Sequence, residues 1–319
     1  MKFTKVQGAG NDFILVKTSD MQRDWSPVAR AICDRHFGVG GDGLLLALPS
    51  VVADFQMRIF NPDGSEAEVC GNGLRCLAKY AVDEGLTSTK VQQISVETRS
   101  GIRRITLHYE KKFGGENTKG KLKRGEASLT QLFPLSFEGE GDKGGEVVRI
   151  QVSMGEPEFG AKDIPIVLEP GRGNLLDIKP ILDYHIIVDG EELFLSFVSM
   201  GNPHAVYFGQ YPVSNFPLSQ LGPKVEQHKM FPQRVNFEVA KIISRQSIEA
   251  RVWERGVGET LACGSGACAV AVTAQLHGYI DNKVAVKLPG GILEVEWNGV
   301  GEVFLSGPVA VVFTGDWAE

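Results

Sequence analysis

The sequence is short of positive charge and of long apolar runs, and each shortage excludes a class of protein. Its 319 residues include 33 Lys and Arg against 39 Asp and Glu, which gives a net charge of −6. Binding to a phosphate backbone requires concentrated positive charge, so nucleic acid is not an expected partner. No apolar run reaches the roughly 20 residues that a helix needs to span a bilayer, so no membrane segment is expected. These shortages argue against nucleic acid and a membrane as partners.

Cysteine is also scarce, with five residues in the whole chain. Disulfide frameworks are typical of short chains dense in cysteine, so this low and odd number favours reduced thiols in a cytosol. The first residues, MKFTKVQGAG, lack the apolar core of a signal peptide. We therefore expect a cytoplasmic protein, or its equivalent in a plastid, in which the 43% of apolar residues build sizeable cores.

What the sequence does contain is one pattern that occurs twice. CGNGLRCLAKYAVDEG (70–85) and CGSGACAVAVTAQLHG (263–278) both open with Cys-Gly-x-Gly and close with Gly. Upstream and without a gap, RIF (58–60) matches RVW (251–253). Equivalent elements lie about 190 residues apart, which indicates a duplicated domain rather than a short solenoid repeat.

The repeated elements predict a sheet and a helix in each half. DFQMRIFN (54–61) and SIEARVWE (247–254) alternate or are largely apolar, as strands do. A helix follows each Cys-Gly-x-Gly, and the second one is apolar on every face, which is typical of a helix inside a core. We expect an α+β fold of two pseudo-symmetric domains, each a curved, mostly antiparallel β-sheet wrapped around a central helix. The Gly- and charge-rich segment 113–146 is expected to be an exposed insertion and domain boundary.

The predicted helix starts give Cys70 and Cys263 a chemical role. The N-terminus of a helix has unpaired N–H groups and a partial positive charge, which favour a thiolate and lower the pKa of the thiol. Neighbouring glycines allow a carboxylate to approach those N–H groups. One such thiol suits nucleophilic catalysis. Two facing thiols suit inversion of a stereocentre, because one removes a proton and the other returns one on the opposite face, while both helix termini stabilise the carbanion.

Polar residues at matching points of the repeat indicate a cleft between the halves. They are Asn11 and Asn202, which each follow a glycine, Asn61 and Glu254, which each follow a strand, and Asn236, which begins the strand NFEVAKI. Arg255 provides a cation suited to bidentate binding of a carboxylate. His204 follows Asn-Pro and is suited to tune a neighbouring thiol.

Two motifs allow other interpretations. GVGGDG (38–43) fits the dinucleotide-binding pattern, but it follows a helix-like stretch and leads into a strand, so a turn is favoured. The pairs Cys70/Cys76 and Cys263/Cys268 do not favour a zinc site. One of the pairs lacks the C-x₂₋₄-C spacing of zinc ligands, and no histidine pair accompanies them. Cys33, Cys76 and Cys268 are expected to be small core residues. No metal site is therefore predicted.

Taken together, the motifs resemble those of a known family. GAGNDF, FGVGGDGL, RIFNPDGSEAEVCGNGLRC, SMGNPH, VNFEV and WERGVGETLACGSGACA match diaminopimelate epimerase, a cofactor-independent amino-acid racemase, in order and over almost the whole chain. The resemblance implies that LL- and meso-diaminopimelate are interconverted without a cofactor, on the route to lysine. It also implies that Cys70 and Cys263 form the catalytic thiolate/thiol pair and that the protein is a homodimer.

The resemblance assigns further roles residue by residue. The residues whose backbone holds the carboxylate of the reacting end are matched by Gly71, Asn72, Gly264 and Ser265. The residues that bind the far end of the amino acid are matched by Asn61, Asn202, Asn236 and Arg255. Further substrate contacts are matched by Asn11 and Glu254, and the residues that tune the thiols by His204 and Glu254.

The resemblance also implies that the C-terminal strand returns to the first half, which gives halves of 1–145 plus 307–319 and of 146–306. One position departs from the family, since many relatives have Gln where this chain has Gly43, and the polar contact of that side chain is lost.

Two other functions remain as alternatives. A proline-type racemase would use the same thiols but needs no far-end site, so Arg255 counts against it. A redox module would need the two cysteines to work as a disulfide.

Overall fold

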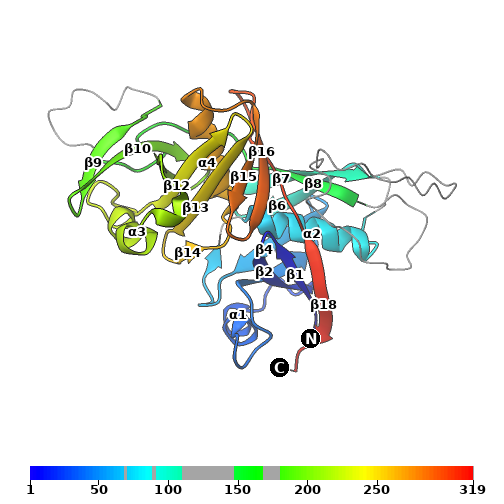
Figure 1. Cartoon of the computed structure of the whole chain (residues 1–319). Coiled ribbons are helices and arrows are strands. Elements are labelled where there is room, and N and C mark those ends of the chain that lie inside the picture. Colours follow the sequence, from blue (N-terminus) through cyan, green and yellow to red (C-terminus); the bar gives the residue numbers. More distant parts are fainter. Residues whose placement is uncertain (68–69, 88–90, 110–146, 168–179, 319) are drawn as a thin grey trace, which may run out of the picture.

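The computed structural model describes residues 1–67, 70–87, 91–109, 147–167 and 180–318 of the chain. Figure 1 shows two groups of strands joined near the middle of the molecule, with helix α2 packed against one group and helix α4 against the other. The predicted exposed insertion lies outside the described residues.

Each group contains its own set of strands and helices. The first group consists of β1 (Lys2–Gly8), β2 (Asn11–Lys17), α1 (Ser26–Cys33), β3 (Gly43–Leu48), β4 (Phe55–Phe60), β5 (Glu66–Ala67), α2 (Gly71–Asp83), β6 (Gln93–Thr98), β7 (Gly101–Tyr109) and β8 (Val147–Ser153). The second consists of β9 (Tyr184–Val188), β10 (Glu191–Ser199), β11 (Pro203–Phe208), a 3-10 turn (Val213–Asn215), α3 (Leu218–Glu226), β12 (Asn236–Ser244), β13 (Ser247–Glu254), β14 (Gly258–Thr260), α4 (Gly264–Leu276), β15 (Lys283–Leu288), β16 (Gly291–Glu296) and β17 (Phe304–Ser306). The last strand is β18 (Ala310–Asp316).

Both groups pair their strands in the same order. In the first, β1 and β2 form an antiparallel pair, β2 runs parallel to β3, β3 antiparallel to β4, and β4 parallel to β6. In the second, β10, β11, β12, β13 and β15 repeat these four pairings with the same directions. The duplication in the sequence is therefore also a duplication of topology. The predicted α+β class with two similar domains is confirmed.

Two pairings connect the groups and the chain ends. β8 lies antiparallel to β17, with Val152 opposite Leu305, which makes one continuous sheet through both groups. β18 lies antiparallel to β1, so the last strand belongs to the sheet in which the chain begins. How the chain divides at 1–145, 146–306 and 307–319 stays a prediction.

The two central helices lie in one shared hydrophobic core. Residues 266–274 of α4 are all buried, as its uniform apolar sequence predicts. In α2, Leu74 and Leu77 are buried in the same cluster, while Lys79 and Asp83 form an ion pair on the helix surface. Within the described ranges, no helix is long and apolar enough to cross a membrane.

Candidate active site

Cys70 and Cys263 occupy equivalent positions at the start of the two central helices. Each is the N-cap residue and has an extended backbone, with φ of −141° and −116°. Each Sγ accepts a hydrogen bond from the backbone N–H three residues on, from Gly73 at 3.4 Å and from Gly266 at 3.4 Å. The thiols thus take the place that a serine or aspartate oxygen usually takes in a helix cap.

The two helix starts meet at their first glycines. A Cβ on Gly264 would lie 3.7 Å from Gly71 Cα and 3.0 Å from Leu305 Cδ2. A Cβ on Gly71 would lie 3.1 Å from that same Leu305 atom and 2.9 Å from Met154 Sδ. Leu305 belongs to β17, at the junction of the sheets, and packs against both helix starts. Because neither glycine has a side chain of its own, the two partially positive helix termini come close together.

On the Cys70 side, a network of amides links the thiol to the loop between α1 and β3. Asn11 Oδ1 accepts a hydrogen bond from Asn72 Nδ2 at 3.2 Å and from Cys70 Sγ at 3.9 Å. Asn11 Nδ2 donates to Asp42 Oδ2 at 2.8 Å, and the same oxygen accepts from Asp12 N at 3.0 Å. Asp42 therefore fixes the orientation of the Asn11 amide and turns its oxygen toward the thiol.

On the Cys263 side, a buried histidine and carboxylate hold the equivalent asparagine. His204 Nε2 lies 3.0 Å from Asn202 Oδ1, and His204 Nδ1 lies 2.7 Å from Glu238 Oε1. Both ring nitrogens are therefore engaged, one by the Asn202 amide and the other by the Glu238 carboxyl group. Asn202 Nδ2 donates to Ser265 Oγ at 3.4 Å, and that hydroxyl lies 3.5 Å from Cys263 Sγ. A chain of polar contacts thus runs from Glu238 to the thiol.

Carboxylates are concentrated on the Cys263 side. Glu254 is hydrogen-bonded to Cys263 and accepts a hydrogen bond from Thr260 Oγ1 at 2.5 Å. Burial raises the pKa of Glu254 above its ordinary value, while these two hydrogen bonds act in the opposite direction. Burial likewise raises the pKa of Glu238, and His204 opposes that effect. Both acids therefore hold a proton more readily than an exposed glutamate does.

The prediction that the helix starts lower the pKa of the two thiols is wrong. Burial raises the pKa of Cys70 to about 11, and the N–H of Gly73 lowers it by less than burial raises it. Burial raises the pKa of Cys263 well above its ordinary value, and the charge of Glu254 raises it further. Desolvation disfavours a thiolate more strongly here than the helix termini favour it. The nearby acids also make a thiolate costlier at Cys263 than at Cys70.

The residues predicted to bind the far end of the substrate are only partly brought together. Asn236 Oδ1 accepts a hydrogen bond from Arg255 N at 2.9 Å, and Arg255 Nη1 donates to Gln233 O at 3.2 Å. Asn61 Nδ2 instead donates to Ser65 Oγ at 2.9 Å, inside its own turn. Among the described residues, this side-chain hydrogen bond of Asn61 does not join it to the rest of the predicted site.

The missing side chain at Gly43 has a steric cause. A Cβ there would lie 2.9 Å from Phe60 O and 3.4 Å from Phe13 Cδ1. Phe13 pairs with Gly43 across parallel strands, just as His204 pairs with Asn236 in the other half. Gly43 and Asn236 therefore occupy equivalent positions in the duplicated topology. In the first half, the pair consists of the Phe13 ring and a glycine, whereas in the second half it consists of two polar side chains, His204 and Asn236.

Three residues of this network were not predicted from the sequence. Asp42 belongs to GVGGDG, which follows helix α1 and leads into strand β3. A dinucleotide-binding loop has the reverse order, since it follows a strand and leads into a helix. Glu238 is 0% exposed, and its only signal is an acid within the apolar strand NFEVA. Arg75 is also 0% exposed, and its signal is a charge in the first turns of a buried helix. In the part of the chain that the structure describes, no three His, Cys, Asp or Glu side chains group as metal ligands.

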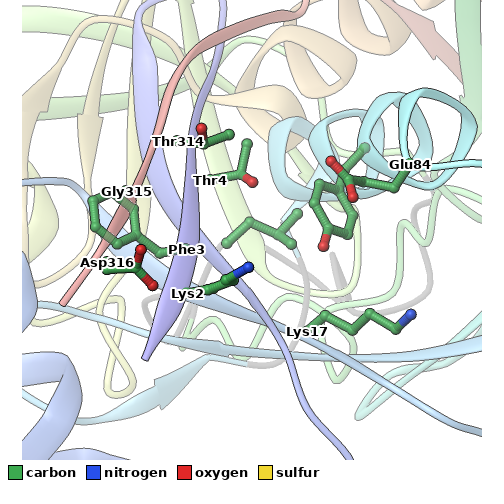
Figure 2. A pocket seen from close by; sticks show the side chains of 10 residues that line it. Lys2, Phe3, Thr4, Lys17, Glu84, Thr314, Gly315 and Asp316 are labelled. Carbon is green, nitrogen blue, oxygen red and sulfur yellow. The ribbon is translucent and has the colours of Figure 1, made fainter. Parts of the chain in front are cut away.

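A separate cavity lies on the first sheet, at the C-terminal end of α2 (Figure 2). Its volume is about 560 Å³. It is lined by Lys2, Phe3, Thr4, Leu15, Lys17, Tyr80, Glu84, Thr314, Gly315 and Asp316. None of the predicted site residues borders it, so it is not the site formed by the two thiols.

The fold recurs in solved structures of distant proteins. A PhzF-family phenazine biosynthesis protein from Bacillus anthracis matches with a TM-score of 0.64 at 16% identity, over 100% of this chain and 99% of that one. A probable proline racemase from Agrobacterium radiobacter matches with 0.62 at 15% identity, over 99% and 92%. A hydroxyproline epimerase from Agrobacterium vitis matches with 0.64 at 13% identity, over 99% and 91%. The chain therefore has the two-domain α+β fold of the PhzF and proline racemase proteins.

Sequence relatives place the chain more narrowly within this fold. The family model for diaminopimelate epimerase matches residues 3–129 and 196–312. The diaminopimelate epimerase of Acetivibrio thermocellus is 42% identical over 99% of this chain and 98% of its own length, and that of Methanococcus maripaludis is 39% identical over 99% of each. The chain belongs to the diaminopimelate epimerase family and is an isomerase. The resemblance identified from the motifs is confirmed.

Proposed function

We propose that this protein interconverts LL- and meso-2,6-diaminopimelate by proton transfer between Cys70 and Cys263, as a cofactor-independent step in lysine biosynthesis. The observation that supports this most is the approach of the two helix starts. The thiols cap helices whose first glycines, Gly71 and Gly264, nearly touch. Two thiols at adjoining, partially positive helix termini suit one small substrate held between them.

In the proposed reaction, one thiolate removes the α-proton and becomes a thiol. The opposite thiol donates its proton to the other face of the same carbon and becomes a thiolate, so the carbon inverts and the number of protons is unchanged. The N–H groups around Gly71, Asn72, Gly264 and Ser265 receive the carboxylate and stabilise the negative charge of the carbanion. The α-ammonium group of the substrate brings positive charge beside the buried thiols, which favours the thiolate.

The residues around the thiols have supporting roles in this proposal. Glu254, through its hydrogen bond to Cys263, and His204, through Asn202, tune the Cys263 thiol. Asn11 contacts the Cys70 thiol in the same way. The residues proposed to bind the far amino-acid end are Asn61, Asn202, Asn236 and Arg255. A guanidinium binds a carboxylate through two parallel hydrogen bonds, which suits the second carboxylate of diaminopimelate.

Incubation with LL-diaminopimelate in deuterated water tests the proposal. The parent protein should form the meso isomer and incorporate deuterium at the α-carbon, whereas proline should stay unchanged. Cys70→Ala and Cys263→Ala should each abolish epimerisation. Cys76→Ala and Cys268→Ala remove buried thiols from the same two helices and should retain it. Full epimerisation by either of the first two variants would contradict the assignment of two bases.

We also propose that the protein is a cytoplasmic homodimer. All five cysteines are free, which suits a reducing compartment. Strand β18 has β1 on one side and, among the described residues, no strand on the other, while Val312 is 55% and Phe313 47% exposed. Exposed apolar residues on an unpaired edge suit a second copy of the chain. Phe313→Asp should then shift the mass measured by light scattering from dimer to monomer, and an unchanged mass for the variant would contradict this interface.

A further inference from the structure

Arg75 is a buried cation that the proposed reaction has not used so far. It lies on the second turn of α2, five residues after Cys70, and it is the largest fully buried side chain in the part of the chain that the structure describes. Its guanidinium donates to Asn72 Oδ1 at 2.6 Å and to Gly71 O at 3.4 Å, and its Nε has no partner. Among the described residues, no carboxylate forms an ion pair with it.

The guanidinium lies against backbone from near both ends of the chain. A Cβ on Gly8, at the end of β1, would lie 3.6 Å from Arg75 Nη2. A Cβ on Gly307, just after β17, would lie 3.2 Å from the same atom. The side chain is therefore enclosed by backbone from both ends of the chain and cannot turn outward to solvent.

Through Asn72, Arg75 reaches both thiol-bearing helix starts. Because Asn72 Oδ1 accepts from Arg75, its Nδ2 points the other way. That nitrogen donates to Asn11 Oδ1 at 3.2 Å, beside Cys70, and to the backbone oxygen of Ala262 at 3.3 Å. Ala262 directly precedes Cys263. One amide, whose orientation Arg75 sets, therefore connects the two halves of the site.

Stability alone does not account for a buried, unpaired guanidinium. Arginine stays protonated in proteins, so the charge is permanent. Burying a charge without an ionic partner is costly, and well-packed apolar residues often replace buried ions without loss of stability. The proposed reaction does form negative charge nearby, on a thiolate and on the carbanion. Burial raises the pKa of Cys70, and among the effects that lower it is the charge of Arg75.

We propose that Arg75 is a positioning residue for the reaction, which orients Asn72 between the two helix starts and opposes the negative charge that forms there. This inference rests on the proposed function for the identity of the substrate. The effect of Arg75 on the Cys70 thiol does not depend on the identity of the substrate. The role of Arg75 and the proposed function can therefore be tested separately.

Three substitutions separate charge from packing. Arg75→Met removes the charge and the donors and retains a long side chain, Arg75→Gln removes the charge and retains a donor, and Arg75→Lys retains the charge. The matched control is Arg104→Met, because that exposed arginine on β7 pairs with Glu302, away from the helix starts. Each variant is alkylated with iodoacetamide over a range of pH, and peptide mapping gives the rate at Cys70 alone.

The neutral variants Arg75→Met and Arg75→Gln should alkylate Cys70 on the order of tenfold more slowly at pH 8, which corresponds to a pKa higher by about one. Arg75→Lys should recover most of that rate, and Arg104→Met should match the parent. In turnover, the neutral variants should lose kcat more than they raise KM. A merely structural role would lower the melting temperature and leave the pH profile of alkylation in place.

The inference is overturned if a folded neutral variant alkylates Cys70 with the parent's pH profile. Should Arg75→Met fail to fold, Arg75→Gln gives the same readout, because it also removes the charge and retains a polar group in the buried site. If the parent does not epimerise diaminopimelate, the proposed function fails, and the alkylation comparison still decides the role of Arg75.

Discussion

Replacing Asp42 with alanine should slow the reaction by releasing Asn11. Asp42 Oδ2 is the acceptor that holds Asn11 Nδ2 at 2.8 Å, and it thereby turns the opposite end of the amide to the Cys70 thiol at 3.9 Å. Without this acceptor, the orientation of the Asn11 amide depends on the hydrogen bond from Asn72 Nδ2 alone, and orientations that present its NH₂ group to the thiol become accessible. Asn11 can then no longer accept from the thiol, and Cys70 loses the contact that orients its S–H group.

The size of the effect follows from the contacts. A hydrogen bond to a charged acceptor contributes about 1.5–3 kcal/mol when it is buried. The Asp42 side chain is 39% exposed, so solvent screening reduces the effect to about 1–2 kcal/mol. In kcat/KM this corresponds to a loss of roughly 5- to 30-fold. Most of it should appear in kcat, because Asn11 faces the reacting thiol.

Initial rates of deuterium incorporation give kcat and KM for the Asp42→Ala variant. The matched control is Asp54→Ala, because Asp54 Oδ2 also accepts two hydrogen bonds, both from Ser95 and both at 2.7 Å. Asp54 lies just before β4, at the opposite end of that strand from its pairing with β5. The two variants should lose comparable melting temperature, but only the first should lose activity. Asp42→Asn retains an acceptor for Asn11 and should stay near the parent.

Two outcomes would refute this reasoning. If Asp42→Ala keeps the kcat/KM of the parent, the orientation of Asn11 does not matter for turnover. If Asp54→Ala loses as much activity as Asp42→Ala, the effect is a general loss of stability and not a change at the thiol.

Three further predictions concern binding, acid stability and oxidation. Arg255→Lys keeps the charge but loses the planar fork, so kcat/KM for diaminopimelate should fall about tenfold or more, and parental turnover would contradict the far-end site. Although burial alone would raise the pKa of Asp12, hydrogen bonds led by that of Arg35 lower it from 3.8 to about 2. The contribution of Asp12 to the free energy of unfolding should therefore be complete above about pH 4 and be lost between about pH 4 and 2. Urea unfolding of Asp12→Asn over this pH range should not show this loss. Mild oxidant should link Cys70 to Cys263 and stop turnover until a thiol reductant is added, and peptide mapping that finds another pair would contradict the facing helix starts.

Much of the architecture could be predicted from the sequence because it depends on local pattern. Cys-Gly-x-Gly at 70–73 and at 263–266 places each cysteine at the start of a helix, since an extended cap residue and small residues favour that turn. The alternation of apolar and polar residues in 54–61 and 247–254 predicts strands, and the predicted elements follow in the same order in both halves of the sequence.

The tertiary structure alone decided how the site is tuned. Helix starts predict acidic thiols, yet burial within the joined core raises the pKa of Cys70 to about 11, and burial is a sum over the whole fold. The partner of Asn11 is Asp42, 31 residues away, and the partner of His204 is Glu238, 34 residues away. No local period encodes such contacts, because they arise only when parallel and antiparallel strands bring distant segments into register. The burial of a single guanidinium between two duplicated halves has the same origin.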